Sequence, residues 1–279
     1  MVNYSAAFKL PFTNLQRSAV LFLIVALTSL ASTTYQVIKK VADGAAGPGS
    51  AHAPVLLSAR LVTVIVEIIF SMIVAGYSVR IAASAVRGKN EMPSFDNVPE
   101  LAGKGFQYLA ASLIYLLPLI AFLLALALAI AANSLGLLLA VAVFGGFAML
   151  VWAFFMVYSR PILLTHFAHE NRFAAFFEIK KILGFSFNST YFMAWLAAKG
   201  YSIEITIPYA IISITAGLLA RFTTPYALFL LVPFVALYAV ILMPTVTNLY
   251  GQAYRDITAG KHAATVVAPA APRRARRKK

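Results

Sequence analysis

Two ionisable residues in an apolar stretch are the first candidates for chemistry in this chain. Glu67 stands within LVTVIVEIIFSMIVAG, some ten residues into the stretch, which is roughly 15 Å at the helical rise. A carboxylate at that depth is costly unless a cation reaches it, and proton or cation relays use such groups. Arg60 lies seven residues earlier on the same helix face and can approach Glu67. The pair predicts either a relay or a structural interaction between helices.

The two readings of Glu67 differ in a measurable property. A relay requires Glu67 to exchange protons, whereas a structural role requires only a hydrogen bond or ion pair. Proton flux in proteoliposomes, compared between the wild type and Glu67→Gln, separates them, because equal flux removes Glu67 from any transport mechanism.

A second pair of charges occurs later in the chain. Glu204 and Lys199 are five residues apart, so they do not share a helix face and do not make a good i,i+4 pair. We interpret Glu204 as an interfacial charge near the start of a membrane span. Lys199 is interpreted as a cation that extends its side chain towards the membrane surface.

Acid–base and metal chemistry have few candidates. Asp96 and Glu100 stand four residues apart, but Pro99 lies between them and no His is near. His166 and His169 are the only close pair among four His, and two ligands without a third do not make a metal site. The chain has no Cys, which excludes thiolate chemistry.

Enzyme signatures are absent from the sequence. There is no GxSxG, HExxH, P-loop or Rossmann fingerprint. We therefore expect no enzymatic activity, no metal and no cofactor. An integral-membrane lipid enzyme remains a third hypothesis, and it requires these residues to converge at one interface: Asp96, Glu100, His166, His169 and Glu170.

The elements that carry these residues are membrane spans. The chain is 61% hydrophobic and 11% charged, whereas soluble domains carry about 25% charged residues. A membrane-spanning helix needs about 20 mostly apolar residues. The sequence predicts an all-α polytopic membrane protein with about six transmembrane helices. They lie at about residues 18–38, 57–83, 106–132, 135–158, 201–220 and 225–250.

The orientation follows from the distribution of Lys and Arg. With six spans both termini share one side, and nineteen basic residues fall on that side against four on the other. The positive-inside rule therefore predicts cytoplasmic N- and C-termini in the cell membrane.

Residues 170–198 alternate aromatic and charged side chains at near-helical spacing. This pattern favours an amphipathic helix in the cytoplasmic interface, with Lys180 and Lys181 at the lipid headgroups. The alternative is one long helix over residues 187–219, which places Lys199 deeper.

The chain divides into a six-helix transmembrane domain over residues 1–258 and a basic tail over 259–279. The tail is rich in Ala and Pro before its basic end and is predicted to be disordered. It either fixes the topology or contacts anionic headgroups, and nucleic acid is not expected as a partner. The basic residues at its end are Arg273, Arg274, Arg276, Arg277, Lys278 and Lys279.

The polar stretch 88–106 reads as a cytoplasmic elbow between the second and third spans. Gly88 suits the position after a helix end, and Asn97 with Glu100 resembles an N-cap and its N3 acid. Phe95 is expected to hold the turn against the headgroups. The elbow candidates are Gly88, Pro93, Phe95, Asp96, Asn97, Pro99 and Glu100.

The stretch GYSVRIAASAVRGKNEMPSFDNVPELAGKGFQYLAASLIYLLP closely resembles the archaeal and bacterial membrane proteins grouped as domain of unknown function 4013 (DUF4013). FAAFFEIKKI resembles a segment shared with that family and with the membrane domain of glycerophosphodiester phosphodiesterases. The resemblance implies an architecture rather than an activity. Residues that occupy the family's positions are Gly76, Tyr77, Arg80, Gly88, Pro93, Phe95, Asp96, Leu101 and Gly105.

The functional expectation combines these observations. We expect an integral membrane protein without catalytic activity of its own, which organises the membrane or serves as an accessory subunit. Its expected partners are membrane lipids, above all anionic ones, and a protein partner or a second copy of the chain. The alternative is a small transporter or channel subunit that uses the intramembrane carboxylate of Glu67.

Overall fold

The protein is built from helices. The computed structural model describes residues 2–46 and 53–267, and no strand occurs among them. The long helices follow one another through short connections, because inside lipid a chain must satisfy its backbone polar groups within its own helices. The α-helices of the described chain are α1 (Tyr4–Lys9), α2 (Leu15–Ala46), α3 (Ala53–Val86), α4 (Val98–Ala131), α5 (Leu135–Ala140), α6 (Gly146–Glu170), α7 (Ile179–Ser186), α8 (Ser189–Phe222) and α9 (Leu231–Val267).

Four shorter helical turns connect these helices. Three are 3₁₀ turns, and the fourth is a π-helical turn that joins α5 to α6 into one nearly continuous element. They are η1 (Leu10–Phe12), η2 (Val141–Gly145), η3 (Phe173–Phe177) and η4 (Pro225–Leu230).

Six segments of the described chain are long and apolar enough to cross a membrane, which confirms the predicted number. Large apolar side chains point outwards along them: Phe144 is 76% exposed and Leu150 71% exposed, as expected only if lipid surrounds them. The six segments are Leu15–Ala42, Pro54–Val86, Val98–Ala131, Leu135–Glu170, Ser189–Phe222 and Pro225–Gly260.

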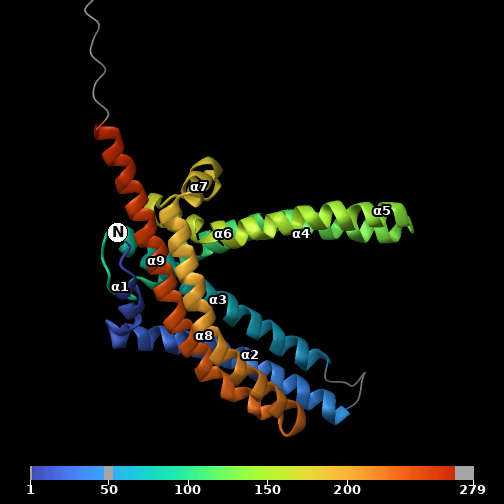
Figure 1. Cartoon of the computed structure of the whole chain (residues 1–279). Helices are drawn as coiled ribbons and strands as arrows, with labels where there is room; N and C mark the ends of the chain where they lie inside the picture. The colour runs from blue at the N-terminus through green and yellow to red at the C-terminus, as the bar shows by residue number, and fades with distance from the viewer. Residues whose placement is uncertain (1, 47–52, 268–279) are drawn as a thin grey trace, which may run out of the picture.

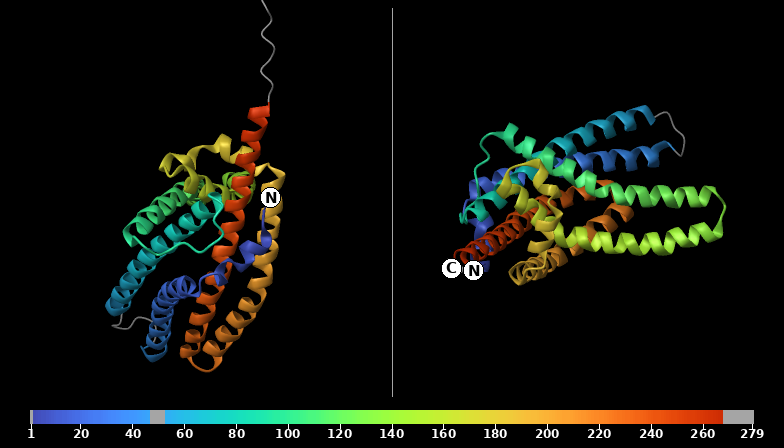
Figure 2. Two further views of the ribbon diagram at one scale, coloured as in Figure 1. Left: turned by 90° about the vertical axis from the view of Figure 1, so that its left-hand side faces the viewer. Right: turned by 90° about the horizontal axis from the view of Figure 1, so that it is seen from above.

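The six helices form two groups that diverge. Figures 1 and 2 show the hairpin of α4, α5 and α6 pointing away from the group formed by α2, α3, α8 and α9. The elbow between α3 and α4, α7 and the end of α9 lie at the end where the groups meet, together with α1 (Figure 1). We call this end the terminal side and the opposite end the loop side.

Close helix contact at the terminal side joins the two groups. A Cβ atom added to Gly76 of α3 would lie 1.8 Å from the carbonyl oxygen of Leu101, and one added to Gly105 of α4 would lie 1.7 Å from that of Met72. Only glycine permits this approach. The buried core lies here, where aromatic residues of α6, α8, α9 and η3 pack, among them Phe167, Tyr191, Tyr250 and Phe176.

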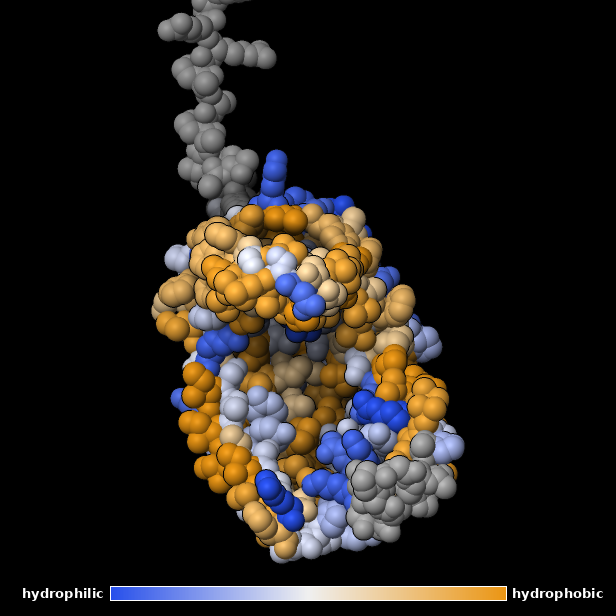
Figure 3. All heavy atoms as spheres, turned by 90° about the vertical axis from the view of Figure 1, so that its right-hand side faces the viewer, coloured by the Kyte–Doolittle hydropathy of each residue, from blue (hydrophilic) through white to orange (hydrophobic). Residues whose placement is uncertain are grey.

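The loop side is open by comparison. Figure 3 looks onto this side: the tip of the hairpin, at the top, is covered mainly by apolar side chains, and a hollow separates it from the ends of the other helices. No residue of the most apolar window of Leu135–Glu170 is buried within the described chain. The hairpin therefore presents its surface to its surroundings on most sides.

The segment after α6 differs from the preferred prediction of one amphipathic helix over residues 170–198. Helical turn η3 and helix α7 are followed there by the start of α8, which is a single helix from Ser189 to Phe222, close to the alternative prediction. The physical reason is a cap: the side chain of Asn188 accepts a hydrogen bond from the backbone N–H of Thr190, at 2.9 Å, and starts a new helix.

The C-terminal helix runs further than the predicted domain boundary. Helix α9 continues to Val267, so residues 259–267, predicted to belong to a disordered tail, are helical. The six basic residues from Arg273 to Lys279 lie outside the described residues, and their predicted headgroup contact stays a prediction.

Candidate functional site

The elbow is built by the local signals in its sequence. Gly88 has a φ of +82°, the left-handed conformation expected after a helix end. Asn97 accepts a hydrogen bond from the backbone N–H of Glu100 at 3.4 Å, and Pro99 sits in the first turn of α4. These features place the polar loop at the end of two spans.

Arg80 holds the elbow from α3. Its guanidinium donates to the carbonyl of Ser94 at 3.0 Å and to that of Asp96 at 2.6 Å, and it lies 3.3 Å from the carboxylate of Glu100. Lys104 reaches the same carboxylate at 2.7 Å. Glu100 is therefore a counter-ion for two cations, which is a structural task rather than that of a free base.

Phe95, predicted to hold the turn against the headgroups, is half-buried against α3, and its contact with headgroups stays a prediction. Its ring stacks on Tyr77 of α3, with centroids 3.9 Å apart and planes 12° apart. The Tyr77 hydroxyl donates to the carbonyl of Pro93 at 2.8 Å, and Arg17 of α2 donates to that of Met92. The Phe95 ring and the carbonyls of Met92 and Pro93 thus find their partners inside the protein, which explains why the turn packs against α3.

These contacts shape a polar hollow of about 570 Å³ at the terminal side, which we call the basic cavity. Five basic side chains line it against two carboxylates, from α2, α3, the elbow and α4, with the end of α6 closing it. The lining residues are Arg17, Arg80, Ala83, Ser84, Arg87, Lys89, Glu91, Pro93, Ser94, Glu100, Lys104, Ala168, His169 and Asn171.

Two of the five cations are unengaged. Arg87 and Lys89 are exposed, and their side chains make no ion pair or hydrogen bond with the part of the chain that the structure describes. Arg17, Arg80 and Lys104 are held in place by carbonyls and by Glu100. The cavity thus has three basic side chains that are held by partners and two exposed cations, Arg87 and Lys89, that are open to an anion.

A buried network around His166 was missed by the sequence reasoning. The imidazole is 1% exposed, with Nδ1 2.8 Å from the hydroxyl of Tyr254 in α9 and Nε2 2.9 Å from the carboxylate of Glu178. Arg172 and Lys181 also contact that carboxylate. Both ring nitrogens are used, so His166 joins α6, α9 and the η3–α7 connection.

Glu178 is the carboxylate of this network, and it lies between two membrane spans rather than inside one. Hydrogen bonds from Lys181 and then His166 lower the pKa of its carboxyl from 4.5 to about 2, and the nearby Arg172 adds to the effect. Lys181, predicted to meet lipid headgroups, is thus paired with Glu178 at 2.8 Å, whereas Lys180 is exposed.

The residues required for a lipid enzyme occupy different settings. Glu100 and His169 line the basic cavity, and His169 lies 3.7 Å from Glu170, which pairs with Arg172 at 3.3 Å. His166 is buried against Glu178 and Tyr254, and the enzyme hypothesis stays a prediction. No group of three His, Asp or Glu able to hold a metal occurs within residues 2–46 and 53–267.

Arg60 and Glu67 are brought together on α3. The closest nitrogen–oxygen distance is 4.0 Å, and both side chains are partly exposed. The Arg60 guanidinium also lies 5.1 Å from the ring centre of Tyr35 in α2. The predicted approach of the two charges fits this geometry, and the relay role of Glu67 stays a prediction.

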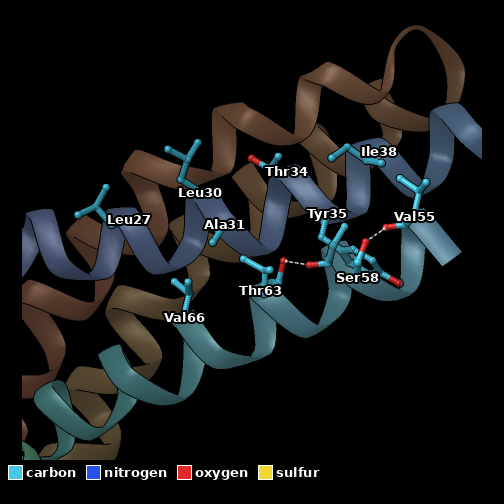
Figure 4. Close-up of a pocket in the computed structure, with 12 residues that line it drawn as sticks. Leu27, Leu30, Ala31, Thr34, Tyr35, Ile38, Val55, Ser58, Thr63 and Val66 are labelled. Carbon is cyan, nitrogen blue, oxygen red and sulfur yellow. Dashed lines mark hydrogen bonds between the residues drawn. The ribbon is translucent and has the colours of Figure 1, made fainter.

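A separate pocket of about 550 Å³ lies between α2 and α3 near this pair (Figure 4). Its walls are mainly aliphatic, with Thr34, Tyr35, Ser58 and Thr63 as polar members. The hydroxyls of Ser58 and Thr63 bond to carbonyls of their own helix, so they offer little to a polar ligand. Neither Arg60 nor Glu67 lines the pocket.

Glu204 and Lys199 point to different surroundings on α8. The Lys199 ammonium lies 5.6 Å from the ring centre of Trp195, whereas Glu204 is exposed in a groove beside α1. The structure does not bring the two charges into an ion pair within the described chain, in agreement with their spacing.

Comparison with known proteins identifies one family. The family model described as "Protein of unknown function (DUF4013)" matches residues 60–219, which include the elbow, the His166–Glu178 pair and most of α8. No curated protein and no solved structure matches the chain.

Proposed function

The chain belongs to the DUF4013 family, whose description assigns no activity, and from that premise we propose that it is a non-catalytic membrane protein that binds anionic lipid headgroups in the basic cavity. In this role it organises the surrounding bilayer or serves a membrane complex as an accessory subunit. The observation that carries the proposal is the concentration of five cations in one polar hollow.

The charge of the basic cavity supports an anionic ligand. Guanidinium and ammonium groups form charge-assisted hydrogen bonds with phosphate oxygens, and such bonds are stronger than neutral ones. Glu91 and Glu100 offset part of the charge, and Glu100 is already paired with Arg80 and Lys104. Arg87 and Lys89 are therefore the two groups best able to bind a phosphate.

The position of the basic cavity supports a lipid headgroup over a solute. Arg17 lies in the first turn of α2, and Lys104 lies in the second turn of α4. Arg80 lies in the last two turns of α3, and Arg87 directly follows the helix. Three spans therefore end around the cavity, at the level where headgroups lie in a bilayer. A lipid can reach it without leaving the membrane surface.

The predicted topology supports the same ligand. If the terminal side is cytoplasmic, as the bias of basic residues predicts, the basic cavity faces the leaflet that holds the anionic lipids. Each basic residue near that surface contributes about 1 kcal/mol of attraction.

Binding of a short-chain lipid to the full chain in neutral detergent tests the proposal. Dihexanoyl phosphatidylglycerol is titrated against the wild type and against the double variant Arg87→Gln/Lys89→Gln, with dihexanoyl phosphatidylcholine as the uncharged comparison. We expect the double variant to lose about tenfold or more in affinity for the anionic lipid, because two charge-assisted contacts are removed.

The control removes the same charge elsewhere. Lys39→Gln/Lys40→Gln changes two exposed lysines near the loop-side end of α2. It is expected to bind like the wild type. Equal affinity of all three proteins for the anionic lipid, or equal binding of both lipids, contradicts the proposal.

A further inference from the structure

A second groove lies between α1 and α8. It has a volume of about 640 Å³, and its walls are mainly apolar and aromatic. The residues that matter for its chemistry are Tyr4, Phe8, Met193, Leu196, Tyr201 and Glu204. Glu204 is the only ionisable carboxylate among the residues that line it.

Glu204 has no cation of its own. Its side chain is exposed in the groove, and no ion pair or hydrogen bond to it exists in the described parts of the chain. It lies within the membrane-spanning segment Ser189–Phe222. At the interfacial position that we interpret for Glu204, a carboxylate that pairs with no described cation attracts positive charge, so the groove favours a cationic ligand.

The nearest basic residues on the two helices do not fill this preference. Lys199 is directed to the ring of Trp195, at 5.6 Å, on another face of α8. Lys9 ends α1 and is exposed, without an ion pair to Glu204 in the described chain. Among the described residues no cation pairs with Glu204, which leaves its carboxylate open to a cationic ligand.

The groove is formed before any ligand arrives. The ring of Phe8 stacks on that of Tyr201, with centroids 4.7 Å apart and planes 25° apart, and this contact fixes α1 against α8. α1 is also held to α9, where the side-chain oxygen of Gln252 accepts a hydrogen bond from the backbone N–H of Asn3 at 2.6 Å. A preformed groove spares the ligand the cost of ordering α1.

The aromatic geometry distinguishes two kinds of cation. A quaternary ammonium binds best when several ring faces surround it. Here Phe8 and Tyr201 cover one face of each other, so they do not form such a cage. A primary ammonium instead donates charge-assisted hydrogen bonds directly to a carboxylate. Glu204 therefore favours the primary ammonium.

From these observations we propose that the groove between α1 and α8 binds the primary ammonium headgroup of a membrane phospholipid, with Glu204 as its acceptor. The lipid chains extend from Glu204 towards the loop side, along Ile207 and Ile211, which are exposed on the same helix. This site is separate from the basic cavity and selects the opposite charge, so either proposal can fail without the other.

The test uses the full chain in neutral detergent and three short-chain probes. Dihexanoyl phosphatidylethanolamine is titrated against dihexanoyl phosphatidylcholine and dihexanoyl phosphatidylglycerol, and binding is followed by native mass spectrometry and by the melting temperature. We expect the ethanolamine lipid to bind most tightly among the probes in the Arg87→Gln/Lys89→Gln background, where the anionic site is weakened.

Two variants locate the effect. Glu204→Gln keeps the shape of the side chain and is expected to weaken binding of the ethanolamine lipid about tenfold, since a hydrogen bond to a charged group is lost. Asp96→Asn removes an exposed carboxylate at the elbow and is expected to change nothing. Equal binding of the ethanolamine lipid by wild type and Glu204→Gln overturns the proposal. Binding of the choline lipid to the wild type as tightly as the ethanolamine lipid overturns it as well.

Discussion

Glu178 shows how much structure one carboxylate supports at the terminal side. It accepts hydrogen bonds from His166 of α6, from Arg172 and from Lys181 of α7. The partners belong to three different segments, so the charge of Glu178 ties the η3–α7 connection to the helices below it. Loss of that charge leaves Lys181 and one nitrogen of a buried imidazole without their acceptor, and it leaves Arg172 with Glu170 alone.

We expect the stability of the protein to fall as the pH is lowered from about 4.5 to about 2. The pKa of Glu178 is lowered from 4.5 to about 2 in the folded protein, so its contribution is complete above the unfolded value and disappears as the pH passes through the folded value. The melting temperature in neutral detergent, measured across this range, reports the effect.

Glu178→Gln provides the reference for this titration. The variant lacks the ionising group, so its melting temperature is expected to be lower near neutral pH and to depend less on pH over the same range. If the wild type and the variant lose stability in parallel, the acid sensitivity belongs to other carboxyl groups.

At the scale of the elements, the contact between α3 and α4 is the feature that joins the hairpin to the rest of the molecule. Gly76 and Gly105 face each other's helix so closely that a carbonyl occupies the position of a Cβ atom. The helices diverge away from this point (Figure 2). The basic cavity lies at the same junction, since α3, the elbow and α4 all contribute to it.

Gly105→Ala is expected to destabilise the protein by about 1–3 kcal/mol or more, the usual cost of overpacking a close helix contact. The added methyl would lie 1.7 Å from the backbone oxygen of Met72, which cannot move without shifting α3. The change is measured as the shift in thermal or denaturant unfolding in detergent.

Gly103→Ala is the matched control two residues away. A methyl group at Gly103 meets no atom within 4 Å, so the variant is expected to be neutral or slightly more stable because alanine favours the helix. Similar destabilisation by both substitutions would show that helix contact is not the cause.

At the scale of the whole molecule, a compact terminal side is combined with an open loop side. The buried aromatic core, the elbow and the His166 network all lie where the two groups of helices meet. Towards the loop side the hairpin separates from the other helices (Figures 1 and 3). The two proposed lipid sites lie at the terminal side of the molecule, and they prefer ligands of opposite charge.

The orientation of the molecule is accessible to labelling because the chain has no native Cys. Asp96→Cys places a thiol at the elbow and Lys40→Cys places one near the loop-side end of α2, both at exposed positions. In intact cells, a membrane-impermeant maleimide is expected to label Lys40→Cys and to spare Asp96→Cys until the membrane is opened.

The reverse labelling pattern would place the terminal side outside the cytoplasm. The basic cavity would then face the leaflet that is poor in anionic lipid, and the proposed ligand would lose its main support.

Local features of the protein follow from the sequence alone. The six spans follow from length and hydropathy, and the turn at Gly88 and the cap at Asn97 follow from short-range backbone preferences. The cap at Asn188 is a signal of the same kind, because Asn is a favoured N-cap residue, and it marks the start of the continuous α8. Each of these depends on neighbours within a few residues.

Tertiary structure alone decided which distant residues meet. Phe95 stacks on Tyr77, and His166 contacts both Glu178 and Tyr254. Five cations from three helices and the elbow line one cavity. His166 and Tyr254 are 88 residues apart, so no local pattern relates them. Helix packing brings such groups together, because buried polar side chains must find partners wherever the fold places them.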